Sequence, residues 1–166
     1  MQRWRPLLRA WLPALVWMGI IAGESSNFGS SDNTSRWLYP IMYFLAPEFT
    51  LRHFAITHSV LRKAGHFVGY AMLSLLMFGA WWATMNPPRL RTCLWSEIRR
   101  CWDWRAALLA LLSAVTVASL DEWHQLSLPS RTGAFHDVLL DSAAAICVQA
   151  FVIAFAAPRL YRTRES

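Results

Sequence analysis

Apolar residues gather into four long segments of the chain, with shorter polar stretches between them. A helix that crosses a bilayer needs about 20 mostly apolar residues. The four segments are approximately residues 7–22, 64–85, 104–125 and 138–157. The first is short and contains Arg9, but a basic residue near a helix end can extend its charge to the lipid headgroups. The pattern predicts four transmembrane helices.

The third segment is informative because of how it ends. It reaches the length of a span only if it begins at Trp104 and Arg105 and continues into the polar run from Asp121 to Gln125. Ionisable side chains are therefore expected inside the end of this helix, where they need partners from neighbouring helices.

The residues between the first two spans change character twice. Residues 24–35 are rich in Ser, Asn and Asp, which predicts a turn-rich loop. Residues 36–46 are aromatic but too few to span, which predicts an interfacial helix with Pro40 or Pro47 as a break. Residues 48–62 have mixed polarity and are expected to form a helix that runs directly into the second span.

Composition agrees with a membrane location. The 166 residues are 55% hydrophobic, include ten Trp and have a mean hydropathy of +0.28, whereas soluble domains are about 45–50% apolar. The expected fold class is all-α, a polytopic membrane protein in which a four-transmembrane-helix bundle carries an extracytoplasmic interfacial helix segment between spans one and two. The length predicts a single domain over residues 1–166.

The N-terminus also has the features of a cleaved signal peptide, because Arg3, Arg5 and Arg9 accompany an apolar run. The run leaves through Ile-Ile-Ala-Gly-Glu, without the small-residue exit of a cleavage site. A retained first helix is therefore expected.

The basic residues sort by connection. Eleven of the sixteen Lys and Arg residues lie before span one, between spans two and three or after span four, and five lie in the other two connections. The positive-inside rule then places both termini in the cytoplasm and the protein in the cytoplasmic membrane. The net charge of +6 thus reflects orientation, and no nucleic-acid partner is expected.

Ionisable residues concentrate at the outer ends of spans two, three and four. Lys63, His66 and Tyr70 follow the i, i+3, i+7 spacing of one helical face. At the end of span three, Asp121, His124 and Gln125 are expected to share a face, with Glu122 beside it. Span four begins with Asp137 and Asp141, one turn apart, and Arg131 precedes it; Glu24 arrives at the same level from span one.

Each of these residues also has a purely structural interpretation. Lys63 and Arg131 could anchor helix ends at the headgroups, Tyr70 could be a packing residue, and Asp137 could cap span four. Their combination exceeds what helix ends require, and ionisable residues inside a membrane indicate a functional site. A structural polar clamp stays the alternative.

The residue types suggest acid–base chemistry on an anionic group. A carboxylate beside a His suits a general base held in one tautomer, and Lys63 with Arg131 can hold a phosphate or carboxylate. We assign catalytic roles to His124, Glu122, Asp121 and His66. We assign substrate-binding roles to Lys63, Tyr70, Gln125, Arg131, Asp137 and Asp141.

Metal and thiol chemistry have less support. His66, His124 and two carboxylates form a plausible ligand set for a divalent metal, but their spacing matches no known pattern, so no metal site and no cofactor are predicted. Cys93, Cys101 and Cys147 form no C-x-x-C pair and are expected to be inert thiols.

These motifs resemble those of the VanZ-like family of small bacterial membrane proteins, over about Leu7 to Ala157. The matching elements are Arg62-Lys63-Ala-Gly-His66-Phe-Val-Gly-Tyr70, Asp121-Glu122-Trp-His124-Gln125, Pro129-Ser-Arg131 and Asp137-Val-Leu-Leu-Asp141. The chain departs from the family at Gly69, where an acidic residue is usual, and at Asp141 and Ala145, where Asn and Gly are common. Asp141 could replace the missing carboxylate in space.

The resemblance implies a membrane fold, candidate site residues and a cell-envelope role, since the family is linked to low-level resistance to the lipid-anchored antibiotic teicoplanin. It implies no particular reaction. Three functions follow for consideration: an enzyme acting on a lipid or lipid-linked headgroup, a non-enzymatic structural or lipid-binding protein, and a small proton-coupled carrier. We favour a role directed at membrane lipids or lipid-linked envelope intermediates, and whether it is enzymatic stays open.

Overall fold

The computed structural model describes residues 4–48, 50–86, 103–128 and 134–162. In this part of the chain all regular structure is helical. The elements are α1 (Trp4–Ser25), the short 3₁₀ helix η1 (Asn27–Gly29), α2 (Ser31–Leu45), α3 (Leu51–Met85), α4 (Trp104–Leu126) and α5 (Phe135–Arg162). Four of these helices are long and apolar enough to cross a membrane, namely α1, α3, α4 and α5. The predictions of an all-α fold and four spans are confirmed.

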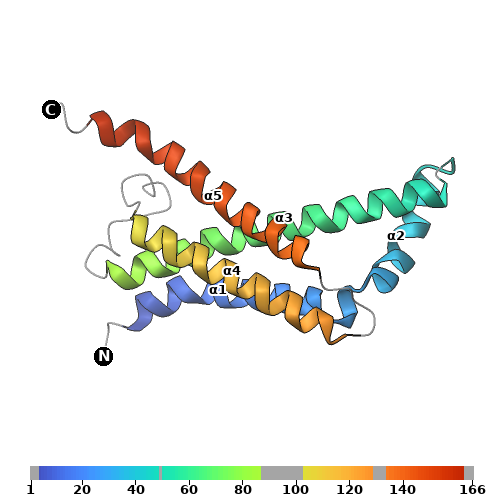
Figure 1. The fold of residues 1–166 in the computed structure, drawn as a ribbon, viewed down its shortest axis with the longest axis horizontal. Helices are drawn as coiled ribbons and strands as arrows, with labels where there is room; N and C mark the ends of the chain where they lie inside the picture. The colour runs from blue at the N-terminus through green and yellow to red at the C-terminus, as the bar shows by residue number, and fades with distance from the viewer. Residues whose placement is uncertain (1–3, 49, 87–102, 129–133, 163–166) are drawn as a thin grey trace.

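The four long helices run alternately up and down (Figure 1). The first residues of α1 and α4 and the last residues of α3 and α5 lie toward the same end of the molecule. The opposite end holds Ser25, Leu126 and Phe135, and we call it the polar end. The shared end of the two chain termini agrees with the predicted topology, while the side of the membrane on which they lie stays a prediction.

Small residues bring the helices close together. On α4 the buried stripe runs through Ala106, Ala110, Ala114 and Ala118, one residue per turn, and α5 contributes the equally buried Ala144 and Ala145. Inside a bilayer no hydrophobic effect drives helices together, so close packing of small side chains has to hold them. The bulky core residues come mainly from α3, which packs against α1, α4 and α5.

Tryptophan side chains add hydrogen bonds between helices. Trp17 Nε1 donates to the carbonyl oxygen of Gly69 at 2.9 Å, and Trp11 Nε1 donates to Thr84 Oγ1 at 3.0 Å, joining α1 to α3. Trp81 Nε1 donates to Ser113 Oγ at 3.1 Å, joining α3 to α4. These bonds satisfy indole N–H groups that would otherwise be costly in an apolar medium.

The connection between α1 and α2 is more helical than expected. The predicted loop over residues 24–35 is wrong, because α1 continues to Ser25 and α2 already begins at Ser31. Ser30 caps α2, since its side chain accepts from the Asn33 N–H at 3.3 Å; the polar residues thus form a helix start and not a loop. The helix continues through Pro40 and ends at Leu45.

The third helix confirms that residues before the second span form one helix with it. Thr50 caps α3, whose 35 residues reach about 52 Å at 1.5 Å per residue. The twenty residues from His66 to Met85 alone reach about 30 Å, the thickness of a bilayer core. The first turns of α3 therefore extend past the ends of the other spans, with α2 beside them (Figure 1).

Candidate functional site at the polar end of the bundle

Three carboxylates lie buried where α3, α4 and α5 meet. Asp121 and Glu122 of α4 are 8% and 5% exposed, and Asp141 of α5 is 1% exposed. All three interact electrostatically with Tyr70 of α3, which is itself fully buried. We call these three acidic residues the carboxylate cluster. Like charges this close repel strongly in a low dielectric, so the cluster favours positive or hydrogen-bonding neighbours.

Hydrogen bonds satisfy part of the cluster. Gln125 Nε2 donates to Asp121 Oδ2 and to Ser25 Oγ, both at 3.1 Å, which ties α4 to the end of α1. Glu122 Oε2 accepts the backbone N–H of Ala134 at 2.7 Å and so holds the start of α5. These bonds join α4 to α1 and to the start of α5 at the level of the cluster.

His66 is the imidazole that lies next to the cluster. Its Nδ1 lies 3.5 Å from Asp141 Oδ2, and its side chain is 27% exposed while that of Asp141 is 0% exposed. The ring also stacks on Tyr70, one turn deeper on α3, with centroids 6.4 Å apart. Neither the carboxylate oxygens of Asp141 nor the Tyr70 hydroxyl has a hydrogen-bond partner among the described residues. The His66–Asp141 pair therefore connects the buried cluster to the surface.

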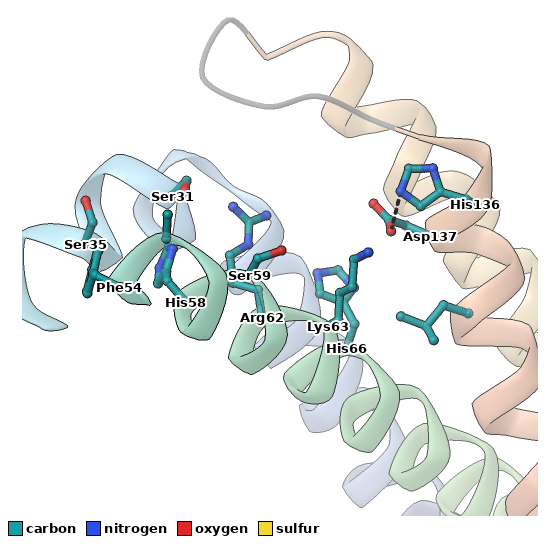
Figure 2. A pocket seen from close by; sticks show the side chains of 12 residues that line it. Ser31, Ser35, Phe54, His58, Ser59, Arg62, Lys63, His66, His136 and Asp137 are labelled. Carbon is teal, nitrogen blue, oxygen red and sulfur yellow. Dashed lines mark ion pairs between the residues drawn. The ribbon is translucent and has the colours of Figure 1, made fainter. Parts of the chain in front are cut away.

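Above His66 a cavity of about 380 Å³ opens between α2, α3 and α5. Figure 2 shows its lining, which is rich in basic side chains. The basic or imidazole groups that line it are those of His58, Arg62, Lys63, His66 and His136. The one lining carboxylate is Asp137, whose Oδ1 lies 3.2 Å from His136 Nε2. We call this hollow the basic cavity.

Arg62 and Lys63 of the basic cavity are not neutralised by carboxylates of the described residues. Among the described residues, neither Arg62 nor Lys63 forms an ion pair with a carboxylate. In Figure 2 the Lys63 side chain points from α3 toward the gap that separates it from α5. Two unpaired cations in one hollow create a local positive potential that an anion can satisfy.

A crossing contact holds α2 over this cavity. Thr34 Oγ1 of α2 and His58 Nε2 of α3 lie 2.9 Å apart in a hydrogen bond whose direction depends on the imidazole tautomer. Tyr39 packs edge-on against Phe54 with centroids 5.1 Å apart, and Phe54 stacks on His58. The position of α2, and with it one wall of the cavity, depends on these few contacts.

The structure brings most of the predicted site residues to the polar end, but in two layers. The buried layer contains Asp121, Glu122, Gln125, Asp141 and Tyr70. The upper layer contains Lys63, His66 and Asp137, which line the basic cavity. The functional roles given to these residues stay predictions.

His124 does not join the others. The expectation that it shares a face with Asp121 and Gln125 is wrong, because His124 is exposed and Glu122 occupies the buried face instead. The stripe that packs inward passes through Ala118 and Gln125, and at about 100° per residue this turns His124 to the side. Arg131, also assigned to the site, lies outside the described residues.

Two residues that line the cavity were given no site role from the sequence, although one of them, Arg62, belongs to a matching family motif. His58 and Arg62 lie eight and four residues before His66 and continue its stripe along α3. The spacing of four residues between His58, Arg62 and His66 is the sequence signal that could have placed them on one helical face. His136 and the hydrogen-bonded Ser25 were likewise missed.

About two turns further along α5 than Asp141, a second polar contact joins α3 to α5. Gln149 Nε2 donates to Ser74 Oγ at 2.9 Å and to the Ser74 carbonyl oxygen at 3.1 Å, and both residues are buried. This contact has the geometry of an interhelical polar clamp. Within the described residues no group of three or more His, Cys, Asp or Glu side chains is arranged to hold a metal ion. Cys147 is an exposed free thiol, and the other two cysteines lie outside the described residues.

Fold and site together define a polytopic helical membrane protein with a buried acidic cluster beneath a basic cavity. The chain belongs to the VanZ/LLP1 family, whose sequence pattern matches residues 10–156. The resemblance inferred from the motifs is thereby confirmed, and the matched range includes every site residue named above. No curated protein and no solved structure matches the chain.

Proposed function

We propose that the polar end binds the anionic headgroup of a membrane lipid or lipid-linked envelope intermediate. The observation that carries the proposal is the pair Arg62 and Lys63, two cations that line one cavity of about 380 Å³ and have no carboxylate partner in the part of the chain that the structure describes. A guanidinium can hold two phosphate oxygens at once, and an ammonium adds a compact charge beside it. The cavity volume accommodates a phosphate with a small polar substituent.

The height of the cavity supports a lipid ligand. If Met85 marks one membrane boundary, about 30 Å of helix places His66 at the other. Arg62 and Lys63 then lie one turn further out, at the level of the phosphates. The excess of Arg in the connections at the opposite end of the bundle supports an outer-leaflet position for this end.

A second candidate function is acid–base catalysis on the bound headgroup. The observation that favours it is the His66–Asp141 pair, with Nδ1 and Oδ2 3.5 Å apart at the floor of the cavity. A buried carboxylate on Nδ1 orients the ring and leaves Nε2 for a bound molecule. In this scheme His66 exchanges a proton with the ligand, and Arg62 and Lys63 hold the phosphate.

Handling of lipid-linked envelope headgroups would also connect the chain with antibiotic resistance. Teicoplanin carries a lipid anchor, so altered presentation of anionic lipids at the outer leaflet would change its access to the cell surface. Expression in a susceptible host is expected to raise the teicoplanin concentration needed for inhibition, and the Lys63→Gln variant is expected to abolish the increase. An unchanged inhibitory concentration with the wild-type protein would separate this chain from the resistance role.

Lipid binding by the purified protein tests the main proposal. Phosphatidylglycerol and phosphatidylcholine are titrated against wild type, Arg62→Gln and Lys63→Gln in a neutral detergent, and the bound lipid is measured by native mass spectrometry. Each substitution is expected to weaken phosphatidylglycerol binding about tenfold, the value of one charge-assisted hydrogen bond. Arg52→Gln is the matched control, since Arg52 is an exposed residue of α3 that does not line the cavity. Equal binding of both lipids by the wild type, or equal loss in the control, contradicts the proposal.

A further inference from the structure

A second hollow adjoins the basic cavity along α3. It has a volume of about 480 Å³ and is lined from the end of α1, η1, α2 and α3. Most of its surface is apolar, and the large apolar residues in its lining are Trp37, Leu38, Ile41 and Leu61. We call it the apolar groove.

One ridge of α3 separates the two hollows and belongs to both. His58, Arg62 and His66 line the basic cavity as well as the apolar groove. They are spaced four residues apart, so they form a continuous row along the helix. On one side of this row Lys63 lines the cavity, and on the other side Gly65 lines the groove. Figure 2 shows the ridge residues from the cavity.

The second wall is divided in the same way. Ser31 and Ser35 of α2 line the basic cavity, whereas Trp37 and Ile41 of the same helix line the apolar groove. The hydrogen bond between Thr34 and His58 joins the two helices where they cross. The large apolar side chains of α2 in these linings thus face the groove, whereas Ser31 and Ser35 face the basic cavity; Glu24 and Thr34 add polar groups to the groove.

We propose that the apolar groove holds an acyl chain of the same anionic lipid whose headgroup occupies the basic cavity. This inference rests on the proposed headgroup binding and narrows it to a ligand that brings its own hydrocarbon chain. The shared ridge lets one amphipathic molecule touch both hollows, with its phosphate at Arg62 and its chain in the groove along Gly65, on the membrane side of Arg62. Trp37, Ile41 and Leu61 are 80%, 55% and 51% exposed, so an acyl chain covers apolar surface that the protein leaves open.

The groove contains a position at which it can be filled selectively. Gly65 lines the groove, and a Cβ at this residue would meet no atom within 4 Å. Gly65→Leu therefore places a branched apolar side chain in the path of the acyl chain and leaves the ridge residues unchanged. Gly19 of α1 is the matched control, because a Cβ there also meets nothing within 4 Å and the residue lines neither hollow.

Two ligands with the same headgroup distinguish chain binding from headgroup binding. Dioleoyl phosphatidylglycerol and the soluble glycerophosphoglycerol are titrated against wild type, Gly65→Leu and Gly19→Leu in a neutral detergent. Gly65→Leu is expected to weaken binding of the lipid at least about tenfold, the factor lost with roughly two buried methylene groups. Its affinity for glycerophosphoglycerol is expected to equal that of the wild type, and Gly19→Leu is expected to change neither affinity.

Each other outcome is decisive. Equal lipid affinity in the wild type and Gly65→Leu overturns the groove assignment, as does a wild type that binds the lipid no more tightly than glycerophosphoglycerol. If Gly65→Leu also loses the soluble ligand, Ile41→Asn on the opposite wall has to lower lipid affinity alone, and failure to do so overturns the assignment. A wild type that binds neither ligand removes the proposed headgroup site itself.

Discussion

The polar end contains two regions of ionisable side chains, a buried acidic one and an open basic one. The carboxylate cluster of Asp121, Glu122 and Asp141 lies inside the bundle, where protein groups hydrogen-bond Asp121 and one oxygen of Glu122 and the His66 ring lies 3.5 Å from Asp141. The basic cavity lies above it, and its cations Arg62 and Lys63 have no such partners among the described residues. Polar groups that a fold needs are expected to be satisfied within it, whereas groups kept for a ligand are left open. The comparison therefore predicts that the cluster affects stability and the cavity affects binding.

The largest effect is expected from the residue that joins the two regions. His66→Leu removes the imidazole that lies 3.5 Å from Asp141 Oδ2 and leaves the buried carboxyl without this neighbour; removal of one member of a buried ion pair costs about 3–5 kcal/mol. The midpoint of denaturant-induced unfolding in detergent is expected to fall accordingly. The double variant His66→Leu/Asp141→Leu is expected to regain most of this loss, because apolar replacement of both partners is often neutral. A double variant less stable than either single one would show that the pair is not the coupled unit.

A smaller loss of stability is expected at Glu122. Glu122→Ala leaves the partly buried Ala134 N–H without its acceptor and is expected to lower the free energy of unfolding by about 1–3 kcal/mol. Glu122→Gln retains an acceptor oxygen at that position and serves as the control, with a loss less than half as large. The same unfolding assay measures both. Similar losses in the two variants would mean that the charge of Glu122, and not its hydrogen bond to α5, stabilises the fold.

In the wild-type protein, salt is expected to weaken lipid binding at the basic cavity without changing the stability that depends on the carboxylate cluster. Raising sodium chloride from 50 to 500 mM shortens the screening length to a few ångströms, so phosphatidylglycerol binding at the exposed cavity is expected to weaken several-fold. The buried cluster is screened much less, and the unfolding midpoint is expected to stay constant over the same range. Binding that is insensitive to salt would argue against an electrostatic headgroup site.

The smallest effect is expected at His124. This residue was assigned a catalytic role from its neighbours in the sequence, yet its side chain is exposed beside the cluster and outside both hollows. His124→Gln is expected to leave the unfolding free energy within about 0.5 kcal/mol of the wild type, as is usual for surface positions. Lipid binding is expected to stay unchanged as well. A tenfold weaker affinity in this variant would return His124 to the site and contradict the arrangement described above.

Some features of this site could be predicted because they depend on spacing along one helix. The i, i+3, i+7 row of Lys63, His66 and Tyr70 lies at the polar end as expected. Asp121 and Asp141 could be assigned to the site for a related reason: an acidic side chain near the end of a span needs polar partners inside the bundle. His58 and Arg62 were overlooked because their importance depends on α2, which folds back across α3 and turns an exposed helix extension into a cavity wall.

The pattern of apolar segments by itself determined the four spans, and the short polar motifs of the sequence indicated the family. Hydrophobic length is a local property of the chain, and a bilayer of fixed thickness selects for it directly. Only the tertiary structure decided which groups share a site. In the structure Glu122 faces inward and His124 faces outward. The alanine stripe of α4 packs against the neighbouring helices, and this packing sets the rotation of α4 and therefore the direction of its polar side chains. The tertiary structure also separated acid from base, burying the carboxylates between helices and leaving Arg62 and Lys63 to the cavity.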